Sequence, residues 1–306
     1  IQGIAGAGGI VVSRSIATDR FTGKELAKAM AIIGAINGIA PVASPVLGGF
    51  LTDSIGWKGI FIVLLLLGVL LLFSNLHLLK NEKTTKGSMN LKSLVSSFGI
   101  VLKNRRYVYY VLQMGFAMGV LFANISSSPF IVQQHYGFSA FEFSLFFGIN
   151  ALAIGLAAGL SVKFKNPEHA MFLGSVGMTM MSAVEFVILS NEYHFAVYEA
   201  VLFVLLFSMG LTFTASTTLA MDCERANSGT ASALFGAAGF AFGGIVSPLV
   251  GLGDILSTTG LIFFVCSVCS LCFSVLAMNQ THTNLWGSFK CKMGPVARFV
   301  FLRREK

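Results

Sequence analysis

Apolar residues fill nine stretches of the chain, and polar residues are concentrated between these stretches. A helix that crosses a membrane needs about 20 mostly apolar residues, because in hydrocarbon its backbone groups must be hydrogen-bonded within the segment. The pattern therefore predicts an all-α membrane protein of about nine transmembrane helices. The expected helices cover residues 1–18, 29–52, 58–79, 107–132, 141–162, 169–190, 197–220, 230–252 and 256–278.

The basic residues support this number of helices. If nine helices alternate in direction, every one of the 21 Lys and Arg residues except Lys58 falls on the same side of the membrane. Loops rich in Lys and Arg stay in the cytoplasm. We therefore expect this side, which includes the C-terminus, to be cytoplasmic, and residue 1 to lie towards the exterior. The same distribution explains the net charge of +8 by contact with the lipid bilayer, so no nucleic acid is expected as a partner.

A sequence repeat connects the two halves of the chain. The segment Ser44-Pro45-Val46-Leu47-Gly48 recurs about 200 residues later as Ser247-Pro248-Leu249-Val250-Gly251. Six expected helices separate the two copies, which predicts a six-helix unit repeated in parallel orientation, as in many transporters. Nine helices are one and a half such units, so we expect about three further helices at the N-terminus.

The repeat and one long polar connection give the domain organisation. Within that connection Leu91, Val95 and Phe98 follow helical spacing, which predicts a short amphipathic helix on the cytoplasmic membrane surface. A solvated linker with chance periodicity would show the same pattern. The expected parts are residues 1–79 (second half of an N-terminal six-helix bundle), 80–106 (linker), 107–278 (C-terminal six-helix bundle) and 279–306 (basic cytoplasmic tail).

No group of residues indicates an enzyme. The five His residues stand singly, which favours neither a catalytic triad nor a metal site. Cys266, Cys269 and Cys272 lie inside an apolar helix, where packing explains them better than an iron–sulfur cluster does. We therefore expect no catalytic residue, no cofactor and no metal. The charged loop residues Asp222 to Arg225 are interpreted as a solvated cluster.

Glycine and proline mark the first two helices. Gly3, Gly6, Gly8 and Gly9 in the first helix predict close packing of helix backbones. The second helix adds proline to the same pattern, so it is expected to be bent or loosened near its outer half. Such a bend is either a hinge for alternating access or a static kink. The residues concerned are Gly34, Gly38, Pro41, Pro45, Gly48 and Gly49.

Ionisable residues within membrane helices are candidates for function, because burying a charge in hydrocarbon costs several kcal/mol. Glu185 could be a proton or cation site or could reach interfacial water, and Arg14 could extend to the cytoplasmic interface. Glu142 and Glu199 begin helices and are interpreted as partners of the helix dipole. A further set of polar, Met and Phe residues either lines a cavity or holds helices together: Gln113, Met114, Phe116, Met118, Asn124, Asn150, Ser208 and Thr212.

Several of these motifs resemble one family. Residues 1–278 are similar to the major facilitator superfamily, and within it to the Bcr/CflA drug:proton antiporters. Gln2, Gly3 and Gly6 look like the end of that superfamily's fourth-helix motif. The segment from Gly38 to Gly49, followed by Gly56-Trp57, is similar to its fifth-helix antiporter motif. Ser128-Pro129-Phe130 and the run from Ser228 to Leu234 also look like Bcr/CflA patterns.

The resemblance implies the architecture of that superfamily, with the fourth to twelfth of twelve helices present. It implies proton-driven efflux of small amphipathic or cationic drug-like compounds across the bacterial inner membrane. The family's first-helix acidic position, its motif after the second helix and its fourth-helix arginine have no counterpart here, so the coupling residues are expected outside the chain. The alternatives are a carrier of one specific metabolite and a membrane fragment that does not transport.

Overall fold

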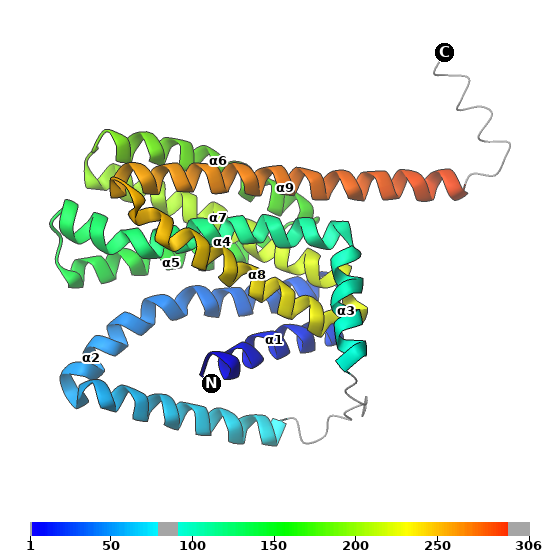
Figure 1. The fold of residues 1–306 in the computed structure, drawn as a ribbon, viewed down its shortest axis with the longest axis horizontal. Helices are drawn as coiled ribbons and strands as arrows, with labels where there is room; N and C mark the ends of the chain where they lie inside the picture. The colour runs from blue at the N-terminus through cyan, green and yellow to red at the C-terminus, as the bar shows by residue number, and fades with distance from the viewer. Residues whose placement is uncertain (1, 79–90, 293–306) are drawn as a thin grey trace, which may run out of the picture.

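The computed structural model describes residues 2–78 and 91–292, and within these ranges it leaves some side chains undescribed, mainly in 2–10, 37–53, 91–95 and 281–292. The described residues form helices joined by short turns, as the long apolar stretches predict (Figure 1). The elements are α1 (Gln2–Arg20), α2 (Gly23–Leu78), α3 (Leu91–Lys103), α4 (Arg105–Pro129), η1 (Phe130–His135), α5 (Ala140–Ser161), α6 (Pro167–Ser190), α7 (Phe195–Cys223), η2 (Arg225–Asn227), α8 (Ser228–Leu249), η3 (Val250–Leu252) and α9 (Ile255–Lys292).

Each of the nine expected transmembrane stretches falls on a helix, and the all-α fold class is confirmed. Among the described residues, seven segments are long and apolar enough to cross a membrane. The expected helices 1–18 and 29–52 lie outside those seven and coincide with α1 and the first part of α2. The remaining seven are Ser54–His77, Arg105–His135, Phe141–Ser161, Pro167–Ser190, Phe195–Cys223, Arg225–Leu252 and Ile255–Gln280.

The second and third expected helices are joined in one element. Helix α2 runs through both, with a kink at Gly56, whose φ of 70° and ψ of 169° are not helical. Only glycine adopts this backbone region readily. The chain reverses direction here without a loop, and the second part of α2 runs back with α1 between the two parts in this view (Figure 1).

Helices α4 to α9 pack into one bundle, with α1 and the first part of α2 against one side of it (Figure 1). Helices α6 and α7 pack closely against each other. A Cβ atom on Gly174 of α6 would lie 2.7 Å from the carbonyl oxygen of Ser208 on α7. Glycine is therefore what lets these two backbones meet, as expected for helices packed in lipid.

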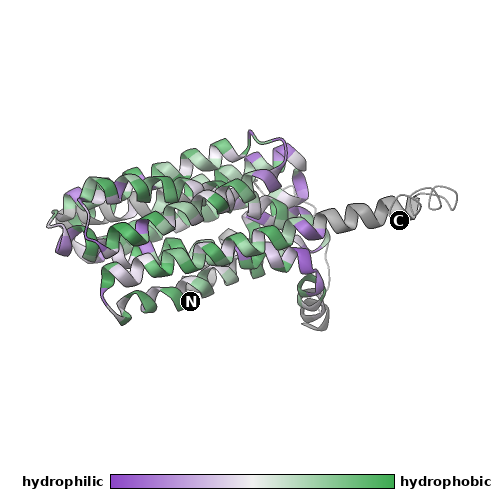
Figure 2. Ribbon diagram, turned by 90° about the horizontal axis from the view of Figure 1, so that it is seen from above, coloured by the Kyte–Doolittle hydropathy of each residue, from purple (hydrophilic) through white to green (hydrophobic). Residues whose placement is uncertain are grey.

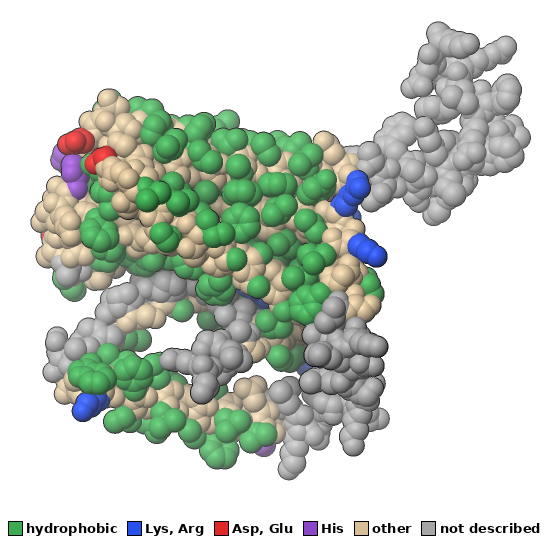
Figure 3. Space-filling view, viewed as in Figure 1, with side chains coloured by type: hydrophobic (Ala, Val, Ile, Leu, Met, Phe, Trp, Pro, Cys, Tyr) green, Lys and Arg blue, Asp and Glu red, His purple; other side chains and the backbone are tan. Residues whose placement is uncertain are grey.

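Polar and apolar residues separate along the helices. Hydrophilic residues gather at the two ends of the bundle and hydrophobic ones fill the region between (Figure 2). Apolar side chains also cover much of the outer face, which suits contact with lipid tails (Figure 3). Lys and Arg appear at the end where α1 and α7 finish and α4 and α8 begin, which we call the basic end. Acidic and His side chains appear at the opposite end (Figure 3).

Candidate substrate cavity

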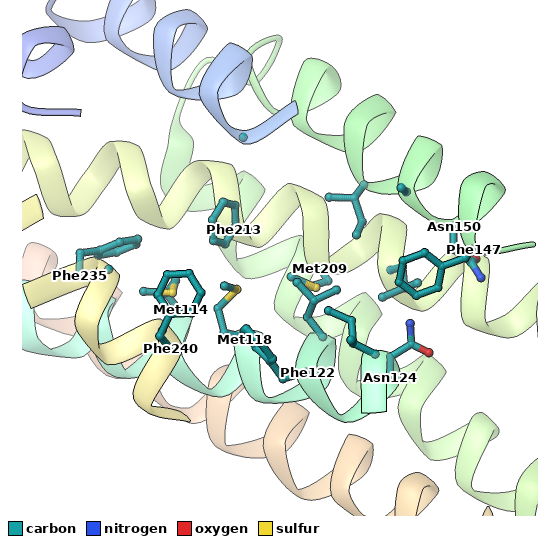
Figure 4. Close-up of a pocket in the computed structure, with 18 of the residues that line it drawn as sticks. Met114, Met118, Phe122, Asn124, Phe147, Asn150, Met209, Phe213, Phe235 and Phe240 are labelled. Atoms are coloured by element: carbon teal, nitrogen blue, oxygen red, sulfur yellow. The ribbon is translucent and has the colours of Figure 1, made fainter. Parts of the chain in front are cut away.

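A cavity of about 210 Å³ lies between the first two helices and the α4–α9 bundle. Arg14 of α1 and Gly34 of α2 line it on one side, and residues of α4, α5, α7 and α8 line it on the other (Figure 4). Most of its surface is apolar and soft. The aromatic and Met residues that face it are Met114, Met118, Phe122, Phe147, Met209, Phe213, Phe235 and Phe240.

The two ends of the cavity differ in their polar groups. Asn124 and Asn150 lie together at one end, whereas Phe235 and Met114 lie at the other (Figure 4). The guanidinium carbon of Arg14 sits 5.6 Å from the centre of the Phe235 ring, within the range of a cation–π interaction. The cavity is therefore amphipathic. Its cationic end, at Arg14, lies towards the basic end of the bundle, and its amide end, at Asn124 and Asn150, lies farther from the basic end.

Arg14 is almost fully buried, with 5% of its surface exposed. Its Nε and Nη1 atoms are buried without a hydrogen-bond partner. Such donors lose their water without replacement, which is unfavourable unless a ligand accepts from them. The sequence-based interpretation, that Arg14 extends to the interface, does not match this burial, because α8 and Phe235 cover the side chain.

The amide end contains a hydrogen-bonded pair. Asn150 Nδ2 of α5 donates to Glu199 Oε1 of α7 over 2.9 Å, and Asn150 Oδ1 is buried without a partner. On α4, Ser128 Oγ donates to Asn124 Oδ1 over 2.7 Å. The cavity is thereby connected to a carboxyl group that does not itself line it.

Four of the eight residues expected to line a cavity do so: Met114, Met118, Asn124 and Asn150. Gln113 and Thr212 instead hold helices together. Gln113 is fully buried, and its Nε2 donates to Thr212 Oγ1 over 2.7 Å and to Ser270 Oγ over 3.0 Å, while its Oε1 accepts from Ser216. The network joins α4, α7 and α9, which is the alternative that the sequence left open.

The other two residues point away from the cavity. Phe116 stacks on Phe273 and makes an edge contact with Phe242, at centroid separations of 5.8 and 4.7 Å. Ser208 Oγ donates to the carbonyl of Val204 on its own helix over 2.8 Å. Residue type alone could not separate these positions from the lining ones, because both kinds of residue occur on both faces of α4 and α7.

The profile of the Major Facilitator Superfamily matches residues 1–248. The chain belongs to the major facilitator superfamily. It is 34% identical over 295 residues to the protein named Uncharacterized MFS-type transporter YdgK of Bacillus subtilis, covering 93% of this chain and 73% of that one.

Two further relatives carry names that refer to drugs. Identity is 25% over 256 residues to the Bicyclomycin resistance protein homolog of Haemophilus influenzae, covering 82% of this chain and 64% of that protein. It is 25% over 167 residues to the Multidrug resistance protein MdtL of Escherichia coli, covering 55% of this chain and 41% of that protein. This superfamily member is a transporter and not an enzyme.

The glycine- and proline-rich residues of this superfamily member lie on α1 and α2. Gly34 faces the cavity, and a Cβ atom there would lie 3.6 Å from Thr214 Oγ1, an ordinary contact distance. The backbone of α2 stays helical from Gly38 to Gly49, and the non-helical residue is Gly56. Gly38, Pro41, Pro45, Gly48 and Gly49, like Gln2 and Gly3 on α1, have side-chain surroundings outside the described residues.

The expected close packing of the first helix does not occur at three of its glycines. A Cβ atom built on Gly6, Gly8 or Gly9 would lie more than 4 Å from every described atom of the other helices. No described element covers this face of α1, whose contacts are instead made near its C-terminal end with α8. The interpretation of these glycines as backbone contacts is therefore wrong for the described structure.

At the basic end, α1 is joined to the loop before α8. Arg225 Nη1 donates to the carbonyl oxygens of Thr18 and Phe21, over 3.1 and 3.0 Å. Ser228 Oγ donates to Asp19 Oδ1 over 2.9 Å. The charged segment that was interpreted as solvated thus makes defined contacts, because the fold brings Arg225 to the last turn of α1, where carbonyl groups lack helical partners.

Proposed function

We propose that this superfamily member exports small amphipathic compounds in exchange for protons, by alternating access across the inner membrane of a bacterium. The cavity between the first two helices and the α4–α9 bundle carries this proposal. It lies where one group of helices meets the other, and both groups contribute to its wall. Motion of one group against the other would open the cavity to one side of the membrane at a time.

The composition of the wall supports broad specificity. Met114, Met118 and Met209 can adapt their shape to different ligands, and the five Phe rings offer stacking surface. A volume of about 210 Å³ is below the range of about 300–1,000 Å³ found for drug-sized ligands, so such a ligand needs the helices to separate. The names of the two drug-resistance relatives agree with this substrate class.

The polar groups favour one arrangement of the substrate. The unpartnered N–H groups of Arg14 would donate to a carboxylate or another acceptor of the substrate, and Asn150 Oδ1 at the amide end would accept from a donor of the substrate. A ligand with only a permanent cation would meet the like charge of Arg14 in a setting of low polarity. We infer that amphipathic compounds with an acceptor group are preferred over simple cationic ones, which narrows the class expected from the sequence.

The contacts at the basic end support alternating access with that end closed. Arg225, Asp19 and Ser228 join α1 to the segment before α8, and these contacts would have to break for the cavity to open there. The concentration of Lys and Arg at this end, with Lys58 at the other, favours a cytoplasmic location for it and for the C-terminus.

The test is substrate-driven proton movement by the full-length protein in inverted membrane vesicles. The vesicles are energised to build a pH gradient, and a set of compounds with one aromatic body is added: one with a carboxylate and an amine, one with the methyl ester, and one with a quaternary ammonium group alone. We expect the first compound to dissipate the gradient most. If none of them does so while one hydrophilic metabolite does, the chain is a specific carrier instead.

A further inference from the structure

Two glutamates lie near the hairpin that joins α6 and α7, one on each of these packed helices. Glu185 lies five residues before the end of α6 at Ser190, and Glu199 lies four residues after the start of α7 at Phe195. At about 1.5 Å per residue and about 3.6 residues per turn, Glu185 sits about 7.5 Å and Glu199 about 6 Å from the hairpin end of its helix, between one and one and a half turns. The turn thus brings together two acids that lie 14 positions apart.

Both acids are withdrawn from solvent and lack cationic partners. Glu185 is 0% exposed, and neither of its carboxyl oxygens has a hydrogen-bond partner. Glu199 Oε2 is likewise buried without a partner, while its Oε1 accepts from Asn150. Within the described part of the chain, neither carboxyl group forms an ion pair. Glu199 is not the N-cap of α7, which is His194, whereas Glu142 forms a capping box with Ser139 at the start of α5.

No Lys or Arg occurs in the turns at this end of the bundle, residues 136–140, 191–194 and 250–254, and the bases there are the exposed His135 and His194. Tyr198 precedes Glu199 on α7, and Tyr136 follows η1, with ring centroids 5.8 Å apart. The turn carries the exposed Glu192, and His135 at the end of η1 is exposed. Ahead of α9 lies the exposed Asp254, whose pKa is lowered by hydrogen bonds from the backbone N–H and the hydroxyl of Ser257.

Two like charges in such surroundings cannot both be stable. Each ionised carboxylate would lose its hydration without a cation in return, and their mutual repulsion adds to that loss. We propose that Glu185 and Glu199 together form a proton-binding site in the α4–α9 bundle, in which at least one carboxyl group holds a proton. This inference rests on the proposed function for its role in transport, but the binding of the proton is a property of the pair itself.

Asn150 connects the proton site to the cavity. Its amide N–H donates to Glu199, and the same side chain lines the cavity. When Glu199 is ionised, it polarises the Asn150 amide and makes Oδ1, which is unpartnered, a stronger acceptor. A substrate donor bound to Oδ1 therefore favours the ionised form of Glu199, and by linkage a proton on Glu199 weakens substrate binding. Substrate and proton thus weaken each other's binding, as the exchange of one for the other requires.

The site is tested by comparing Glu185→Gln and Glu199→Gln with wild type and with Glu192→Gln, the exposed acid of the same hairpin. The full-length proteins are placed in liposomes, and infrared difference spectra are recorded across steps of pH. We expect wild type and Glu192→Gln to show the carbonyl band of a protonated carboxyl group in apolar surroundings. In Glu199→Gln, Glu185 loses a neighbouring acid, so the pH at which its band disappears should be lower than in wild type.

Absence of the band in wild type, or an unchanged band and titration in both Gln variants, would overturn the inference. Because Gln is close in size to Glu, thermal unfolding of each variant checks that the bundle is intact. Substrate-driven proton flux is measured on the same samples. Flux that persists in both Gln variants without the band leaves the proposed exchange intact and assigns it to other residues. If the band behaves as expected but no compound drives proton flux, the result supports the proton site and contradicts the proposed function.

Discussion

Arg225 Nη1 lies 3.1 Å from the carbonyl oxygen of Thr18, a residue 207 positions earlier in the chain. This contact gives the last turn of α1 a hydrogen-bond donor that its own helix does not supply. Arg225 is held in place by Asp222 at 2.7 Å. The basic end of the molecule is therefore closed by a side chain from the α4–α9 bundle that binds the backbone of α1.

Replacing Arg225 by Gln should loosen this closure. The variant keeps a polar side chain, but Gln cannot form the ion pair with Asp222 and is too short to reach the carbonyl oxygen of Thr18. With a single cysteine introduced at Ser15, we expect modification by a water-soluble thiol reagent to become several-fold faster than in the parent. Arg105→Gln, a change to an exposed arginine at the same end, serves as the control. Equal rates in all three proteins would contradict a closing role for Arg225.

Replacing Arg14 by Gln should lower affinity for substrates with an acidic group. A hydrogen bond to a charged group contributes about 1.5–3 kcal/mol, so the affinity for a carboxylate should fall about tenfold or more. The methyl ester of the same compound should bind nearly unchanged, as measured by calorimetry on the full-length protein. Lys24→Gln, at an exposed position, is the matched variant. A similar loss for acid and ester would indicate a structural effect of Arg14 and not recognition.

Replacing Gly174 by Ala should destabilise the α4–α9 bundle. The new methyl group would lie 2.7 Å from the carbonyl oxygen of Ser208 and 2.8 Å from the backbone nitrogen of Thr212, neither of which can move freely. Overpacking of this kind costs about 1–3 kcal/mol. Gly155→Ala on α5 is the control, because no atom lies within 4 Å of its Cβ position and alanine favours helix. Thermal unfolding in detergent should separate the two variants, and equal midpoints would refute the close contact.

Replacing Gly56 by Ala should disturb the kink in α2. A φ of 70° with a ψ of 169° is a region that only glycine occupies readily, and other residues there cost about 1–3 kcal/mol. Spin labels at the exposed positions Ile36 and Leu66 would report the distance between the two parts of α2. We expect a broader or shifted distribution in Gly56→Ala and an unchanged one in Gly68→Ala, an ordinary helical position. An unchanged distribution in both would place the flexible point elsewhere in α2.

The sequence predicted the helices well and the functional pair poorly, for physical reasons. A run of about 20 apolar residues has few stable forms in a membrane, so the helices follow from composition. Glu199 was interpreted as a helix-start residue because its partner Glu185 is identified only when the hairpin is folded. The symmetric placement of these two acids about the turn at residues 191–194 was the signal available in the sequence.

The cavity was predicted in part for a similar reason. Met114 and Gln113 are neighbours on α4, yet one faces the cavity and the other faces a network among three helices. A residue list cannot assign these faces without the positions of α7 and α9. The bend expected at the prolines of α2 stays a prediction, and the non-helical residue Gly56 lies in the connection expected between residues 52 and 58.

The contacts at two glycines differ, and this difference indicates which helices can slide against one another. At Gly174, backbone meets backbone so closely that α6 and α7 must travel as one rigid body. At Gly34, the approach to Thr214 would leave 3.6 Å even with a methyl group added, so α2 touches α7 only through an ordinary side-chain surface. Shear between helices needs such a smooth surface. We therefore expect slip to pass along α2 and the cavity, with Glu185 and Glu199 remaining within the helices that move together.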